Sequence, residues 1–283
     1  MRMLRFAVGA PGVVVSTVVV AMIGAVLPPW GGIVVGYGGV AVAVLLGVGR
    51  LEPHALRVWC GARPPDGDEA AVLAAAVTRL CRAGIGPPVV DIYVSRTGGQ
   101  SAWAAGSRGV VVPRSMVAAV AEGRLSAEEA AAAMAHAVGV LDVAHGRLQL
   151  VYEFWTLPWM LVAGVATSVG RAFAATPLVG WAWKVRGLYG VIALVQCTRD
   201  GYWFVGVIAC GFLAETYLQP WLRRRWTIRV HERADQFVAR HGLAEAWARL
   251  LARRAAATAR IERIRRLAAT DRQHPTTGPV VVH

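Results

Sequence analysis

Two long runs without a charged residue constrain this chain more than any other feature. Residues 6–27 and 32–48 are rich in valine, alanine and glycine, and the first would rise roughly 33 Å as a helix, enough to cross a bilayer core. It is longer than the apolar region of a cleaved signal peptide, and no convincing A-x-A site follows it. The alternative is a pair of buried core helices. We expect a transmembrane hairpin over residues 1–50.

The distribution of charge favours a membrane protein with both ends in the cytoplasm. The net charge is +13 and the mean hydropathy is +0.47. An arginine excess suits nucleic acid or an anionic membrane face, and the apolar runs favour the bilayer, so we expect nucleic acid not to be a partner. Arg2, Arg5 and Arg50 flank the hairpin on one side. The positive-inside rule then predicts a multi-pass protein of the inner (cytoplasmic) membrane whose soluble part faces the cytoplasm.

A second apolar region spans residues 150–221. Its stretches 150–170 and 202–221 predict a second hairpin, and the basic run 223–225 that follows agrees with a return to the cytoplasm. Charged residues between the two stretches do not suit an external loop, which leaves the number of spans open. Four transmembrane helices in two hairpins are the expectation.

The sequence between the apolar regions has the character of a soluble α+β domain. Apolar residues recur at helical spacing over 69–83, and short strands are expected at 89–94, 102–106 and 109–112. Ser126 and Glu129 form a capping-box pattern that opens a helix carrying an alanine run. We therefore expect an α+β, mainly helical fold.

The helix opened by Ser126 carries an incomplete metal-binding pattern. A zinc peptidase has H-E-x-x-H, with two histidines on one face and a glutamate as general base. This chain keeps His136 but has Ala137 at the general-base position and Val140 at the second-histidine position. Read alone, His136 is a packed histidine in an alanine-rich helix. Glu232 and Asp235 share a face of a later helix, which read alone is a charged, exposed helix.

Taken in order, these motifs resemble the HtpX-like membrane zinc metalloendopeptidases, relatives of the CAAX prenyl proteases. The family's N-A-F-x-x-G, A-H-E-L-G-H, E-x-x-A-D and R-I-x-R-L segments correspond to residues 101–106, 135–140, 232–235 and 260–264. The resemblance implies a zincin-like peptidase domain made of residues 51–149 and 222–270. These two parts are separated by the second hairpin at 150–221 and followed by a tail at 271–283.

The resemblance also implies roles for individual residues. His136 corresponds to the first zinc ligand, Glu232 to the third, and Asp235 to the acid that steadies the site. Catalytic zinc normally takes three protein ligands, so we expect zinc to be absent or weakly bound. Asp142 and His145 point away from His136 around the helix, and His231 diverges by about 100° from Glu232.

Two function hypotheses follow. The first is a catalytically inactive pseudopeptidase that binds membrane or unfolded polypeptides, or an active protease partner. Such a polypeptide could add to an edge strand near 110–112. The second is an active zinc metalloendopeptidase with a rearranged metal site. A weaker third reading is the recruitment of nucleic acid through residues 253–266.

Overall fold

The computed structural model describes residues 2–87, 89–96, 101–144, 149–172, 177–253, 262 and 264–265. The chain is mainly helical with a small mixed sheet, which confirms the expected α+β, mainly helical class. It divides into two compact units, each assembled from two separate stretches. The first comprises Met1–Ala41 with Tyr152–Ile228, and the second comprises Val42–Val151 with Arg229–His283.

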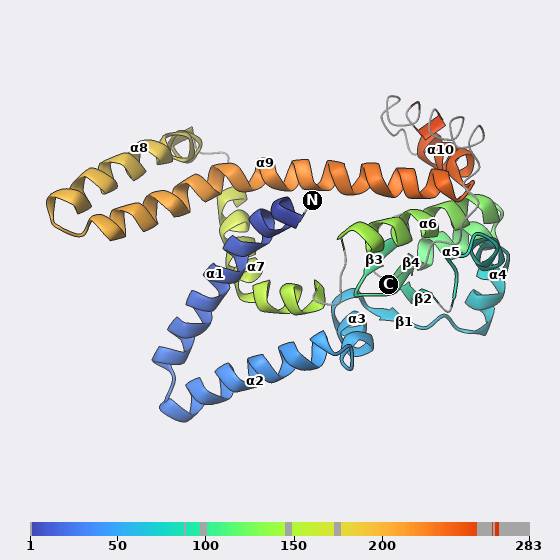
Figure 1. Cartoon of the computed structure of the whole chain (residues 1–283), viewed down its shortest axis with the longest axis horizontal. Coiled ribbons are helices and arrows are strands. Elements are labelled where there is room, and N and C mark those ends of the chain that lie inside the picture. The colour runs from blue at the N-terminus through green and yellow to red at the C-terminus, as the bar shows by residue number, and fades with distance from the viewer. Residues whose placement is uncertain are drawn as a thin grey trace. The chain divides into compact units, whose positions relative to one another are not determined.

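The apolar unit is built from helices alone in the part that is described (Figure 1). They are α1 (Arg2–Val26), most of α2 (Pro29–Gly47), α7 (Gln149–Ala172), α8 (Pro177–Arg199) and the first part of α9 (Trp203–Arg240). Two segments, Gly9–Val26 and Trp30–Gly47, are long and apolar enough to cross a membrane. Only 11% of each segment is buried, so neither is packed like the core helix of a soluble protein.

Only two of the four expected spans are found among the described residues. The described residues of 150–221 form three helices rather than a hairpin of two, because the residues between the two expected stretches contribute the 23-residue helix α8. Polar residues lower the hydropathy of these helices: Lys184 and Arg186 lie within α8, and Glu215 lies within α9.

Contacts inside the apolar unit join its two stretches of sequence. The indole Nε1 of Trp155 in α7 donates a hydrogen bond to Thr17 Oγ1 in α1 at 3.0 Å. Where α1 turns into α2, a Cβ placed on Gly32 would lie 2.9 Å from the carbonyl oxygen of Gly24. Glycine therefore permits the close approach of the two apolar helices near their connection.

The second unit contains a four-stranded mixed sheet. Its strands are β1 (Ala62–Arg63), β2 (Asp91–Ser95), β3 (Trp103–Ala105) and β4 (Gly109–Pro113), in the order β1-β2-β4-β3. β4 pairs in parallel with β2 and antiparallel with β3, so that Val110 lies opposite both Ile92 and Ala104. The expectation that residues 110–112 form an edge strand is therefore wrong, because both sides of β4 already carry ladder hydrogen bonds. The outer strands of the described sheet are β1 and β3.

The other elements of this unit are helices, two of which begin at capping boxes. They are α3 (Glu52–Cys60), α4 (Gly67–Arg82), α5 (Arg114–Ala121), α6 (Ala127–Ala144) and α10 (Ala244–Arg253), with the end of α9. The expected capping box of α6 is confirmed, since the Ser126 amide donates to Glu129 Oε2 at 2.9 Å and the Glu129 amide donates to Ser126 Oγ at 3.2 Å. Asp66 and Glu69 form a second capping box at α4.

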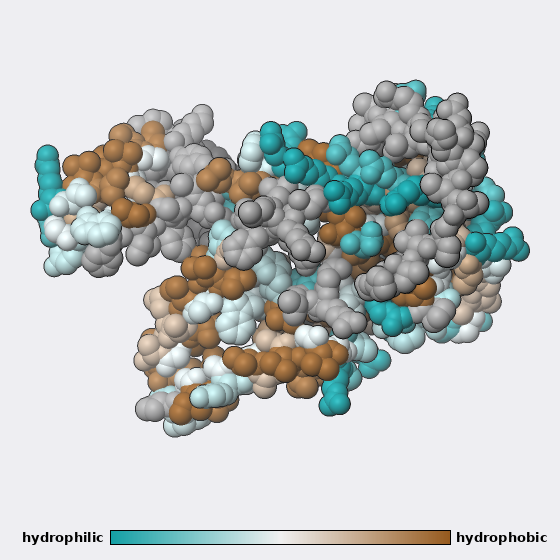
Figure 2. All heavy atoms as spheres, in the orientation of Figure 1, coloured by the Kyte–Doolittle hydropathy of each residue, from teal (hydrophilic) through white to brown (hydrophobic). Residues whose placement is uncertain are grey.

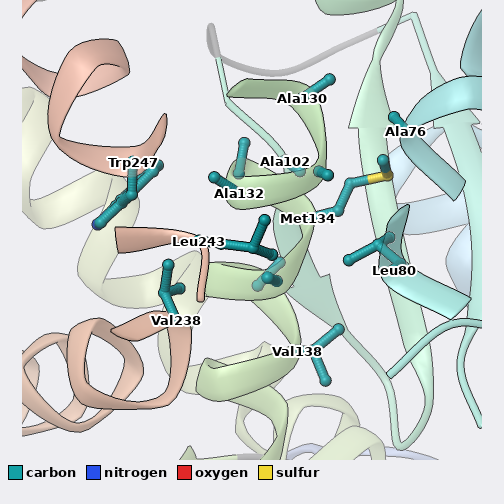
Figure 3. Packing of buried hydrophobic residues seen from close by; sticks show 14 of the residues in the cluster. Ala76, Leu80, Ala102, Ala130, Ala132, Met134, Val138, Val238, Leu243 and Trp247 are labelled. Carbon is teal, nitrogen blue, oxygen red and sulfur yellow. The ribbon is translucent and has the colours of Figure 1, made fainter. Parts of the chain in front are cut away.

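Helix α6 is the centre of the hydrophobic core (Figure 3). Ala76 and Leu80 of α4 lie on one side of it, whereas Val238, Leu243 and Trp247 from the end of the chain lie on the other. The side chains of the alanine run 130–133 are fully buried. Because these side chains are small, helices and sheet can pack closely around one helix.

Candidate functional site

The candidate site lies where α6 crosses the C-terminal part of α9. A Cβ on Gly139 would lie 3.0 Å from Ala234 Cα and 3.0 Å from Phe237 Cβ. Such contacts are tighter than nine in ten real Cβ contacts, so a side chain at this position would have to displace the neighbouring part of α9 by a few tenths of an ångström. His136 lies one turn before Gly139 and thus faces the turn of α9 around Ala234.

Two histidines meet at this crossing. His136 Nε2 lies 3.2 Å from His231 Nδ1, and the ring planes are within 3° of parallel. The ring centroids are 5.4 Å apart, which exceeds the nitrogen–nitrogen distance by about the sum of the two ring radii. The two nitrogens therefore approach along the line that joins the rings. This is the geometry of a direct imidazole–imidazole hydrogen bond.

The other nitrogen of His136 faces a buried acid. His136 Nδ1 lies 3.4 Å from Asp235 Oδ1, and the same oxygen accepts a hydrogen bond of 3.0 Å from Trp247 Nε1. Asp235 is completely buried and His136 is 6% exposed. The indole ring of Trp247 also stacks on His136, with centroids 4.5 Å apart and ring planes 19° from parallel. Three helices, α6, α9 and α10, thus contribute to one buried polar network.

One arrangement of protons agrees with the groups that face each nitrogen of His136. The carboxylate oxygen of Asp235 is an acceptor, so it favours a proton on His136 Nδ1. His136 Nε2 then carries a lone pair and accepts from His231 Nδ1–H. We assign these tautomers from the partners of each nitrogen. The result is a chain of polar groups that runs from His231 through His136 to Asp235. Trp247 ends the chain by donating a hydrogen bond to Asp235.

The structure places the other predicted residues around this network. Ala137 is buried within the core cluster, whereas Val140 is partly exposed. Glu232 follows His231 on α9 and is partly exposed, and its role as a ligand stays a prediction. Asp235 lies beside His136, where the resemblance implies a steadying acid.

Some of the sequence predictions fall outside the described residues. These are His145, most of the R-I-x-R-L segment at 260–264, most of the basic tract 253–266, and the tail 271–283. Asp142, the other acid considered near His136, is exposed on α6.

The residue that contacts His136 directly is His231, which the sequence motifs did not indicate as part of the site. His231 was expected to diverge from the site because it adjoins Glu232, but its ring reaches His136. The signal was present in the spacing: His231 and Asp235 are four residues apart, so they share a helix face more closely than Glu232 and Asp235 do. The sequence carries no comparable signal for Trp247.

The residues present do not fit a catalytic zinc site. Ala137 and Val140 carry no donor atom where a general base and a second ligand are required. Within the described ranges, no group of three or more histidine, cysteine, aspartate or glutamate side chains is arranged to hold a metal ion. In addition, the ligands of one zinc ion direct their lone pairs to a common point, whereas the two imidazole nitrogens here point at each other.

No protein-family model matches this chain, and no curated protein or solved structure matches it either. The resemblance to metallopeptidases therefore depends on the ordered motifs in the sequence.

Proposed function

We propose that this chain is a membrane-attached pseudopeptidase, derived from an HtpX-like framework, that binds polypeptides or an active protease partner without cleaving them. The observation that carries the proposal is the direct contact of His136 Nε2 with His231 Nδ1. In a zinc peptidase that imidazole nitrogen would hold the metal. Here it takes part in a histidine–histidine hydrogen bond that ties α6 to α9.

The chemistry of the neighbouring positions supports an inactive site. Peptide hydrolysis by a metallopeptidase needs a base that takes a proton from the attacking water. Ala137 replaces that base and is buried, so a water molecule there would have neither a proton acceptor nor access. Asp235 is fully buried, and its carboxylate already contacts Trp247 and His136. It is therefore not free to act as the base.

The sheet supports a binding role for polypeptides. β3 is an outer strand of the described sheet and pairs with β4 on its inner side. An extended polypeptide could add to its outer edge through main-chain hydrogen bonds, as in other β-strand additions. β3 also contacts α6, which would place a bound chain near the helix that carries His136.

Metal content and proteolysis test the proposal on the purified full chain. We expect well below one zinc per chain by elemental analysis and no cleavage of casein above the level of a His136→Ala variant. His231→Ala should lower the stability by about 0.5–1.5 kcal/mol through loss of a partly buried hydrogen bond. His54→Ala removes an exposed histidine of the same unit and serves as the matched control.

The opposite outcome would favour a rearranged metalloendopeptidase. His231 lies within reach of His136, and this contact is the specific observation that keeps the second candidate open. Stoichiometric zinc that is lost in both His136→Ala and His231→Ala, together with casein cleavage that chelators abolish, would replace the pseudopeptidase proposal with this one.

Exposed apolar side chains support attachment to a lipid bilayer. Residues of α1 and α2 such as Val14, Met22, Ile33 and Val44 are all more than half exposed. Figure 2 shows hydrophobic residues in brown, among paler ones, on the visible face of these two helices. Apolar side chains also lie exposed on α7, α8 and α9, for example Leu161, Leu188 and Val207. Burial of this surface in lipid would remove an unfavourable contact with water. These helices are consistent with a multi-pass arrangement.

Cysteine labelling tests the proposed topology in the cytoplasmic membrane. In a background with the four native cysteines replaced by serine, a Trp30→Cys variant should react with an impermeant maleimide added outside intact cells. A Ser115→Cys variant should react only after the cells are opened, because the soluble unit faces the cytoplasm. The reverse labelling pattern, or release of the chain from membranes by alkaline carbonate, would refute this placement.

A further inference from the structure

A band of three arginines follows an exposed tryptophan on α9. Arg223, Arg224 and Arg225 are all exposed, and Trp221 is 50% exposed. The guanidinium carbon of Arg225 lies 4.2 Å from the centroid of the Trp221 ring, in a cation–π contact. We refer to these four residues as the Trp–Arg band. On the face seen in Figure 2, hydrophilic side chains follow the C-terminal half of α9.

The charges of the band are not balanced within the described part of the chain. None of the three guanidinium groups forms an ion pair with a carboxylate there. Arg223 Nε donates a hydrogen bond to Gln219 Oε1 at 3.0 Å, which is a neutral partner. Three adjacent cations therefore remain available to an anionic ligand.

The position of the band along α9 matches the edge of a bilayer. Trp203 and Trp221 are 18 residues apart on one continuous helix, a rise of about 27 Å, close to the thickness of a hydrocarbon core. Both tryptophans are at least half exposed, and tryptophan is enriched at both membrane–water interfaces. The arginines begin two residues after the second tryptophan, where a helix with Trp221 at the interface would reach the lipid phosphates.

The spread of the arginines identifies the kind of anion. Consecutive helical residues are about 100° apart, so three of them cover roughly 200° of the helix circumference. Side chains that diverge in this way cannot converge on a single small anion. They can reach phosphates that surround a helix where it emerges from a bilayer, and guanidinium groups bind phosphate in a bidentate manner.

From these observations we propose that the Trp–Arg band binds the headgroups of anionic phospholipids at the membrane surface. The inference rests on the proposed membrane attachment and adds to it a preference for one class of lipid. The tryptophan ring fixes the depth of α9 in the interface and holds the Arg225 guanidinium beside it. The three arginines then attract lipids with a net negative charge more strongly than they attract zwitterionic lipids.

A lipid titration of the purified full chain in neutral detergent micelles tests this inference. Phosphatidylglycerol and phosphatidylcholine are added separately, and the lipid concentration that gives half of the maximal thermal stabilisation is measured. We expect wild type to respond to phosphatidylglycerol at lower concentration than to phosphatidylcholine. The R223Q/R224Q/R225Q variant should need at least about tenfold more phosphatidylglycerol, since each arginine near an anionic surface contributes to binding. The corresponding triple lysine variant should retain part of the preference, because it keeps charge but loses bidentate contacts.

The matched control removes the same charge from the other unit. Arg82, Arg96 and Arg108 are exposed, and R82Q/R96Q/R108Q should change the phosphatidylglycerol response less than twofold. An equal loss in both triple variants would overturn the inference, because it would reflect net charge alone. Equal stabilisation of wild type by inorganic phosphate or by a duplex oligonucleotide would also overturn it. If the protein stays in membranes after alkaline carbonate extraction but shows no lipid preference, only the proposal for the Trp–Arg band is refuted. If the extraction releases the protein, the membrane attachment itself is refuted.

Discussion

The Asp235→Ala variant should lose about 3–5 kcal/mol of stability. Asp235 Oδ1 accepts from Trp247 Nε1 and faces His136 Nδ1 in a fully buried position. Removal of the carboxylate leaves the buried Trp247 indole without its acceptor and takes the charge from beside His136; a lost buried partner costs about 1–3 kcal/mol, and more where it is charged. Thermal unfolding of the full chain, followed by tryptophan fluorescence, should show a melting temperature lowered by roughly 10 °C.

Two further variants make this result specific. Asp235→Asn keeps one oxygen acceptor in place and should lose less than half as much stability. Asp142→Ala removes an exposed acid from α6 and should change stability by no more than about 0.5 kcal/mol. If Asp235→Ala unfolded at the temperature of wild type, the buried network would make no net contribution to the association of α6, α9 and α10.

The Gly139→Leu variant should be destabilised by about 3 kcal/mol or more. A Cβ at this position would already approach Ala234 Cα and Phe237 Cβ at 3.0 Å, so the longer side chain must push α9 away from α6. Overpacking of this kind commonly costs about 1–3 kcal/mol, and more where backbone has to move. The same displacement should separate His136 from His231. Limited proteolysis and thermal unfolding of the full chain measure the effect.

Ala144→Leu is the control for this variant, because it enlarges a partly exposed position near the end of the same helix. It should leave the melting temperature nearly unchanged. A Gly139→Leu protein as stable and as protease-resistant as wild type would show that α6 and α9 do not cross at the described distance.

The sequence predicted the local elements well and the long-range contacts poorly. The strand at 109–112, the capping box of Ser126 and the apolar N-terminal helices each have a signal confined to a few neighbouring residues. β1 has two residues, too few for any periodicity. The inner position of β4 could not be foreseen, because strand order depends on pairing between segments distant in the chain.

For the site, resemblance identified the two helices but not the contact between them. The family's motif pattern indicates Glu232, whereas helix geometry places His231 and Asp235 on a shared face. The role of Trp247 depends on α10 folding back against α6, which no local pattern encodes. The absence of a donor atom from the side chains of Ala137 and Val140 is readable directly from the residue types.

The separation of the histidine pair along the chain has a consequence for synthesis on the ribosome. The partners His136 and His231 are 95 residues apart, and the whole inserted stretch of α7 and α8 is made between them. At 5–20 residues per second, α6 waits roughly 5–20 s before the segment that covers one side of it exists. Throughout this interval a helix whose residues 130–138 are buried in the finished protein lacks part of its covering. A nascent chain that ends before Arg229 can therefore never close its core, and protein quality control should recognise it as unfolded.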